Sequence, residues 1–186
     1  MSKRKIFEIG GIAAGVVLIA FGIASITMSI DGRAEVRDSL AAENIVGTPD
    51  SSIPGQKVDT GSEAKAFAET MREHTIETTD GQTYAEMGRF VDENGKPTND
   101  EALAAKDPET GEPVANQARN IWVTETALTT ALNMAYLAEQ IALFGIVVGV
   151  ALLLSGVGFV VLAVGGALRH RSDVRMRVEK PAAAVG

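Results

Sequence analysis

Two long apolar runs without charge lie near the two ends of the chain. The run at residues 141–168 contains no charged residue and, at ~1.5 Å per residue, would form a helix roughly 42 Å long. The run at residues 9–30 is also free of charge. A hydrocarbon core about 30 Å thick is crossed by about 20 apolar residues. We therefore predict two transmembrane helices.

The run at residues 9–30 has a second interpretation, because a basic start followed by apolar residues is also typical of a cleavable secretory signal. This run is longer than the usual apolar core of about 7–15 residues, and no good small-x-small cleavage motif precedes Asp31. We therefore favour an uncleaved transmembrane helix. Two buried helices of a soluble protein would need more apolar cover than the remaining residues supply.

The residues after the first run keep a helical pattern before it breaks. Residues 33–43 place Val36 and Leu40 on one face, which predicts a helical continuation of the first run. The Gly- and Pro-rich residues 47–55 then interrupt it. A second helix is expected from Ser62, as its N-cap, to about Glu77, with Phe67 and Met71 on one face.

The stretch that follows is predicted to contain turns and one short helix. Asn94-Gly95 favours a tight turn, because both residues tolerate positive φ. Asn99 is expected to cap a short helix through Lys106. Residues 109–113 repeat the Glu-x-Gly-x-Pro pattern of residues 93–97 and predict a second turn.

A long helix is predicted from about Ala115 to Arg171, since residues 118–140 hold no Gly or Pro and run directly into the second apolar run. Ile121, Leu128, Leu132 and Ala135 fall near one face, which we expect to pack against the other helices of the loop. The predicted fold is therefore all-α: a two-helix transmembrane hairpin with a small, mostly helical extracytoplasmic cap and a long second helix that extends out of the membrane.

Charge divides the chain in the same way and orients it. Residues 31–140 carry 21 acidic and 9 basic residues, a net charge of −12, whereas the whole chain has −7. Lys and Arg concentrate on the cytoplasmic side of membrane helices, so both termini are predicted to be cytoplasmic. The predicted segments are a basic N-terminus (1–8), a first span (9–30), an acidic extracytoplasmic domain (31–140), a second span (141–168) and a basic tail (169–186). The residues expected at the membrane interfaces are Lys3, Arg4, Lys5, Phe7, Tyr136, Arg169 and Arg171.

Glycines recur with one spacing in both runs, four residues and then seven. Such steps keep glycines on one helix face and let two helix backbones approach closely. They predict a helix-packing seam, within one chain or between copies, against the alternative that membrane helices are simply glycine-rich. The glycines are Gly11, Gly15, Gly22, Gly145, Gly149 and Gly156.

No catalytic, metal or cofactor site is expected. The chain has no Cys and two His, so thiolate chemistry and Cys-ligated metals are excluded. His74 beside Glu73 and Glu77 offers too few ligands for a structural metal site, and residues 92–95 place their Gly too early for a calcium loop. The acidic loop argues against nucleic-acid binding. No ionisable residue lies inside either run, which disfavours a transporter or channel; Glu139 is expected at the interface or paired in the cap.

Three segments carry a resemblance. Residues 45–50 (IVGTPD), 83–90 (TYAEMGRF) and 120–149 resemble a family of two-pass membrane proteins of actinobacteria and their relatives, for which no activity is established. Some relatives bear the name of an aromatic ring-opening dioxygenase. Such enzymes resemble non-haem iron proteins that need several His and carboxylate ligands. One extracytoplasmic His cannot supply them, so we reject that activity here.

The predicted function is a structural or interaction role in the cell membrane, not an enzyme. The expected partners are the lipid bilayer and either further copies of the chain or another membrane protein. An accessory subunit of a larger envelope or respiratory assembly is the first alternative, and an oligomeric pore is the second.

Overall fold

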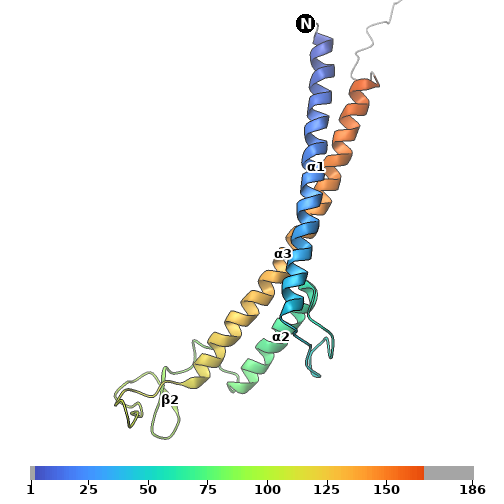
Figure 1. The fold of residues 1–186 in the computed structure, drawn as a ribbon. Coiled ribbons are helices and arrows are strands. Elements are labelled where there is room, and N and C mark those ends of the chain that lie inside the picture. Colours follow the sequence, from blue (N-terminus) through green and yellow to red (C-terminus); the bar gives the residue numbers. More distant parts are fainter. Residues whose placement is uncertain (1–2, 166–186) are drawn as a thin grey trace, which may run out of the picture. The chain divides into compact units, whose positions relative to one another are not determined.

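The computed structural model describes residues 3–165, which are mostly helical (Figure 1). Three helices follow one another: α1 (Lys3–Ala42), α2 (Gly61–Thr78) and α3 (Gln117–Val164). Between α2 and α3, β1 (Phe90–Val91) pairs antiparallel with β2 (Pro97–Thr98). The fold class is therefore all-α, as predicted, with one small β-hairpin in addition.

The chain forms two compact units. The paired-helix unit consists, among the described residues, of residues 3–27 and 146–165, and the central unit consists of residues 28–145. Each of α1 and α3 contributes one segment to each unit. The two units are described separately below.

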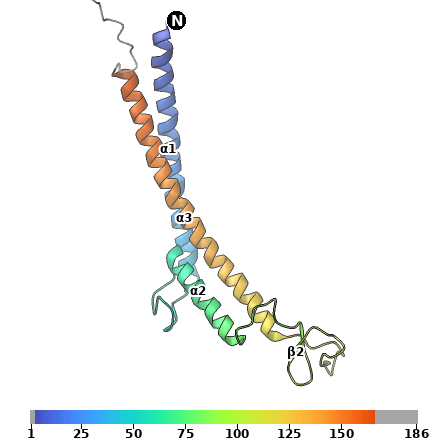
Figure 2. The same cartoon turned by 180° about the vertical axis from the view of Figure 1, so that it is seen from behind.

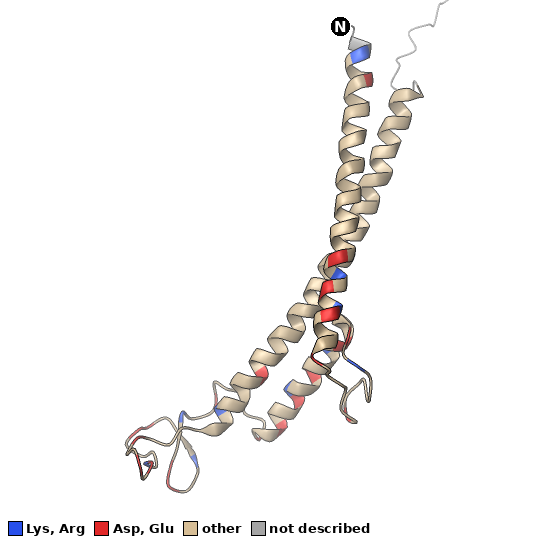
Figure 3. Cartoon of the chain, in the orientation of Figure 1, with Lys and Arg blue, Asp and Glu red and all other residues tan. Residues whose placement is uncertain are grey.

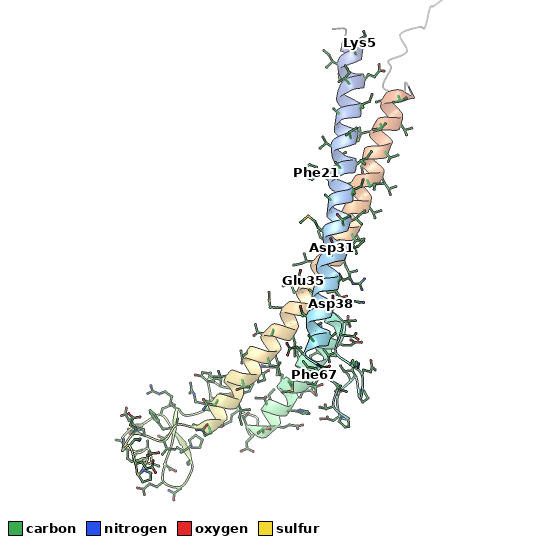
Figure 4. All side chains as sticks on the ribbon, viewed as in Figure 1. Lys5, Phe21, Asp31, Glu35, Asp38 and Phe67 are labelled. Carbon is green, nitrogen blue, oxygen red and sulfur yellow. The ribbon has the colours of Figure 1, made fainter. Side chains whose placement is uncertain are left out.

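In the paired-helix unit, the first part of α1 and the last part of α3 lie side by side (Figures 1 and 2). Beyond Glu8, both segments are free of charged residues, as their tan colour in Figure 3 shows. Large apolar side chains, among them Phe21 and Leu154, are about two-thirds exposed. Figure 4 shows Phe21 projecting from α1. By length and composition, α1 and α3 are each able to cross a membrane.

The central unit has a small core where α2 packs beside α3 and the end of α1. Predicted core positions on each helix are found there: Leu40 of α1, Phe67 of α2 and Leu132 of α3 are buried in one cluster. Val58, just before α2, is fully buried in the same cluster. The helical faces predicted from periodicity therefore meet, except at Ile121, which is 40% exposed and lies outside the cluster.

Local signals explain where α1 ends and where α2 begins. After α1, Asn44 adopts φ 53°, the left-handed conformation that commonly ends a helix. The predicted N-cap at Ser62 is wrong. The N-cap is Thr60, two residues earlier in the chain, and the first helical residue is Gly61. The Thr60 hydroxyl accepts from the N–H of Glu63, and the Glu63 carboxylate accepts from the N–H of Thr60. This reciprocal pair satisfies two donors that a Ser62 cap would leave without partners.

The residues between α2 and α3 confirm both predicted turns but not the short helix. Gly95 and Gly111 have positive φ at the two turns. No helix forms over residues 99–106; instead, the Asn99 side chain accepts a hydrogen bond from the N–H of Arg89, and Asp92 pairs with Ala104 in an isolated bridge. Asn and Asp side chains that bond nearby backbone groups compete with helix formation. The predicted long helix begins at Gln117, and its expected end at Arg171 lies outside the described residues.

Candidate functional site

Two pairs of predicted glycines face each other in the paired-helix unit. A methyl group placed on Gly15 would lie 2.7 Å from the carbonyl oxygen of Gly156, and one on Gly156 would lie 2.6 Å from that of Gly15. Gly22 and Gly149 show the same reciprocal approach, at 2.7 and 2.8 Å. These contacts involve backbone atoms, so no side chain can move aside to relieve them.

The seven-residue step explains why the pairs match in two antiparallel helices. Gly15 and Gly22 are seven residues apart, as are Gly149 and Gly156, so reversing one helix still brings glycine against glycine. Gly11 and Gly145 do not belong to these facing pairs. Larger side chains also pack beside the facing glycines. A methyl group on Gly15, for example, would lie 2.6 Å from the Val160 side chain.

The predicted interface residues are placed individually. Phe7 on α1 is 68% exposed. Tyr136 on α3 is half-buried, with the Lys65 ammonium 5.3 Å from its ring centroid. Lys5 lies on α1, whose helical backbone also includes Lys3 and Arg4. The remaining members of the set, Arg169 and Arg171, lie outside the described residues.

The densest polar contact in the central unit surrounds Glu139 of α3, which is 3% exposed. Its Oε1 accepts hydrogen bonds from Nε of Arg33 at 2.7 Å and from Nε of Arg37 at 2.9 Å. Its Oε2 accepts a hydrogen bond from the N–H of Gly61 at 2.6 Å. One carboxylate therefore joins α1, the N-terminus of α2, and α3. We call these four residues the Glu139 cluster.

Gly61 is required by this close approach. A methyl group at Gly61 would lie 2.8 Å from Oε2 of Glu139 and 2.9 Å from the Cα of Tyr136. Gly61 is also the first residue of α2, where backbone N–H groups have no partner within the helix and the helix dipole favours negative charge. The carboxylate of Glu139 therefore binds where a helix N-terminus best accepts an anion.

Opposing effects set the charge state of Glu139. Burial raises the pKa of this carboxyl, but the hydrogen bonds from Arg33, the Gly61 N–H and Arg37 together outweigh burial and lower the pKa below its usual value. Glu139 precedes the second apolar run and is ionised at neutral pH. The pairing predicted for Glu139 is therefore found, and its position at a membrane interface stays a prediction.

Sequence reasoning did not identify the partners of Glu139. Arg33 and Arg37 are two of the nine basic residues of 31–140, and no local pattern marks them or Gly61 as a binding site. One signal was available: the two arginines are four residues apart and therefore share a helix face. The choice of Glu139 as their partner depends on a contact more than 100 residues away, which no local pattern encodes.

A second buried carboxylate has no basic partner within residues 3–165. Glu125 of α3 is 3% exposed and borders a cavity of about 400 Å³ that is also lined by Met71 and Leu128. Its Oε2 accepts a hydrogen bond from the Thr126 hydroxyl at 3.3 Å, whereas its Oε1 has no partner among the described residues. Glu125 therefore retains unused hydrogen-bonding capacity in the interior of the central unit.

His74 of α2 pairs with Asp50, not with the neighbouring glutamates. Its Nε2 is in short contact with Oδ2 of Asp50. The described residues contain no group of three or more His, Asp or Glu side chains placed to hold a metal ion. The hydrogen bond to His74 lowers the pKa of Asp50 to about 2. The hydrogen bond to Asp50 raises the pKa of His74 above 6.5, against a smaller opposing effect of burial.

This pair predicts a defined pH window. Its stabilisation is present above the usual Asp pKa of 3.8 and is lost as the pH falls through about 2. It is fully present below 6.5 and is lost as the pH rises through the raised pKa of His74. NMR titration of the His74 ring is expected to give a midpoint above 6.5, and Asp50→Asn should move it back toward 6.5. Equal midpoints in the two proteins would show that the pair does not form.

No protein-family model, curated protein or solved structure matches the chain. The resemblance carried by residues 45–50, 83–90 and 120–149 therefore stays a prediction.

Proposed function

We propose that the protein is an integral membrane protein with a structural or interaction role, and that it presents its acidic residues 31–140 outside the cytoplasm. The supporting observation is the exposure of its most apolar helical stretches. Only 11% of the most apolar window of α1 and 17% of that of α3 is buried. The core helix of a soluble protein would be mostly buried, and such a large exposed apolar surface favours lipid as its surroundings.

The orientation follows from charge. Basic residues precede the first apolar run and follow the second, at the ends of the runs that are nearest the chain termini. The positive-inside rule therefore favours a cytoplasmic position for both termini. Phe7 would then lie at the inner interface and Tyr136 at the outer one, where amphipathic rings are favoured. The facing pairs Gly15–Gly156 and Gly22–Gly149 support a seam that packs the two spans of one chain against each other.

The proposed role predicts how the purified protein behaves. In mild detergent, mass photometry is expected to show a discrete assembly of identical copies, and removal of the detergent without added lipid should cause precipitation. Liposomes that contain the protein should show no ion flux beyond that of empty ones. Stable dispersion in plain buffer would contradict the membrane assignment, and flux from the protein by itself would favour the oligomeric pore.

One observation favours the alternative of an accessory subunit in a larger assembly. A groove of about 620 Å³ runs between α1 and α3 in the central unit and is lined by apolar residues such as Leu40 and Leu132. Glu35 and Glu43 also line it, so a partner would need basic groups beside an apolar stripe. If the discrete assembly forms only together with a co-purifying protein, this alternative replaces self-association.

A further inference from the structure

The Glu139 cluster has more positive than negative charge. Arg33 and Arg37 share a single carboxylate, to which the N-terminus of α2 is also directed. Acidic residues lie nearby in the sequence of α1, and Figure 4 labels three of them, Asp31, Glu35 and Asp38. None of these three forms an ion pair with either arginine among the described residues. The cluster can therefore accept a second anion.

The arginines also have donors to offer. Arg33 uses only Nε on Glu139, so both of its Nη groups have no hydrogen-bond partner in the described part of the chain. Arg37 approaches the same oxygen through Nε and Nη2, which leaves its Nη1. The two side chains are 36% and 41% exposed. A guanidinium held by Nε can present its remaining N–H groups to a phosphate in a fixed orientation.

Their position along α1 identifies the anion. Arg33 is three residues beyond Ile30, the end of the first apolar run, and Arg37 is seven beyond, or roughly 4.5 and 10 Å at 1.5 Å per residue. The headgroup layer on each face of a bilayer is about 5–7 Å thick. The Cα of Arg33 thus falls within the headgroup layer, and that of Arg37 lies one helical turn beyond it on the same face of α1.

We propose that Arg33 and Arg37 bind the phosphodiester of an outer-leaflet phospholipid through their Nη groups while their Nε groups stay on Glu139. A lipid is favoured over a free phosphate because residues 31–140 carry a net charge of −12, which repels dissolved anions. A phosphate held in the membrane plane is already concentrated beside the two arginines. The inference rests on the proposed membrane function.

Native mass spectrometry of the full chain tests it, from micelles that contain equal amounts of phosphatidylglycerol and phosphatidylcholine. The wild-type protein should carry more phosphatidylglycerol, since its net negative phosphodiester lacks the choline charge. Arg33→Gln should lower the ratio of the two adducts about fivefold, the effect of one arginine at a membrane surface. The matched control is Arg72→Gln, because Arg72 lies over the Trp122 ring of the central unit and should leave the ratio unchanged.

Three further arms assign each outcome. Arg33→Lys keeps a positive charge beside Glu139, but an ammonium lacks the planar set of donors with which a guanidinium can bind two anions. The variant should still fold, and its adduct ratio should fall less than that of Arg33→Gln. Inorganic phosphate at about 10 mM should not displace the lipid; displacement would overturn the lipid assignment in favour of a free anion. Equal ratios for Arg33→Gln, Arg33→Lys and Arg72→Gln would overturn the site itself. A protein that takes up neither lipid and needs no detergent would instead contradict the membrane function.

Discussion

Replacing Arg33 and Arg37 together with Gln is expected to lower the free energy of unfolding of the central unit by about 3 kcal/mol. The reason is that Glu139, 3% exposed, would keep a buried charge with only the Gly61 N–H as donor. Breaking a buried ion pair from one side costs about 3–5 kcal/mol, and the partial exposure of the arginines favours the lower end. Urea titration in mild detergent, followed by the fluorescence of the single tryptophan, Trp122, measures this loss.

The matched comparison is Glu139→Gln. It removes the same ion pairs but leaves two partly exposed guanidiniums that water can solvate, so its expected cost is about 1–2 kcal/mol. The order of the two effects is the prediction. If Glu139→Gln cost as much as the double arginine variant or more, Glu139 would not be the buried member that the contacts indicate.

Replacing Gly22 with Leu is expected to separate the two helices of the paired-helix unit. Even a methyl group there would lie 2.7 Å from the Gly149 carbonyl oxygen and 2.8 Å from the Leu153 nitrogen. Overpacking against side chains costs about 1–3 kcal/mol. A clash with backbone atoms cannot be relieved by a side-chain rotation, so one helix has to move away from the other. We expect Gly149→Leu to act in the same way.

Gly10→Leu is the control, because a methyl group on Gly10 meets nothing within 4 Å. Spin labels can be placed on the exposed Val17 and Leu154 positions through introduced cysteines, since the chain has no native Cys. Electron paramagnetic resonance should give a narrow distance distribution for the parent and Gly10→Leu, and a broad or shifted one for Gly22→Leu. Equal distributions in all three would show that the glycines do not form a packing seam.

The sequence predicts the features that depend on local patterns. Apolar length gives the long helices, and a period of 3.6 residues identifies the faces that bury Leu40, Phe67 and Leu132. Turn chemistry correctly places the turns at Gly95 and Gly111. The N-cap of α2 lies two residues before the predicted Ser62, because Thr60 and Glu63 form a capping box that Ser62 cannot form.

Features that depend on contacts between distant residues could not be read in this way. The glycine spacing is visible in each run, but the register that pairs Gly15 with Gly156 depends on how two helices meet. Arg33, Gly61 and Glu139 come from three helices, and only their packing brings them together. The helix expected over residues 99–106 is absent for a more local reason, since the Asn99 side chain accepts a hydrogen bond from the N–H of Arg89.

The central claim is that α1 and α3 cross a bilayer and leave residues 31–140 on its outer side. Single cysteines at the exposed Asn94 position and at Ala183 in the tail, treated with a membrane-impermeant maleimide, test it most directly. In intact cells the reagent is predicted to label Asn94→Cys at once and Ala183→Cys only after permeabilisation. Labelling of Ala183→Cys but not Asn94→Cys in intact cells would reverse the orientation, and recovery of both proteins in the soluble fraction would contradict the membrane assignment.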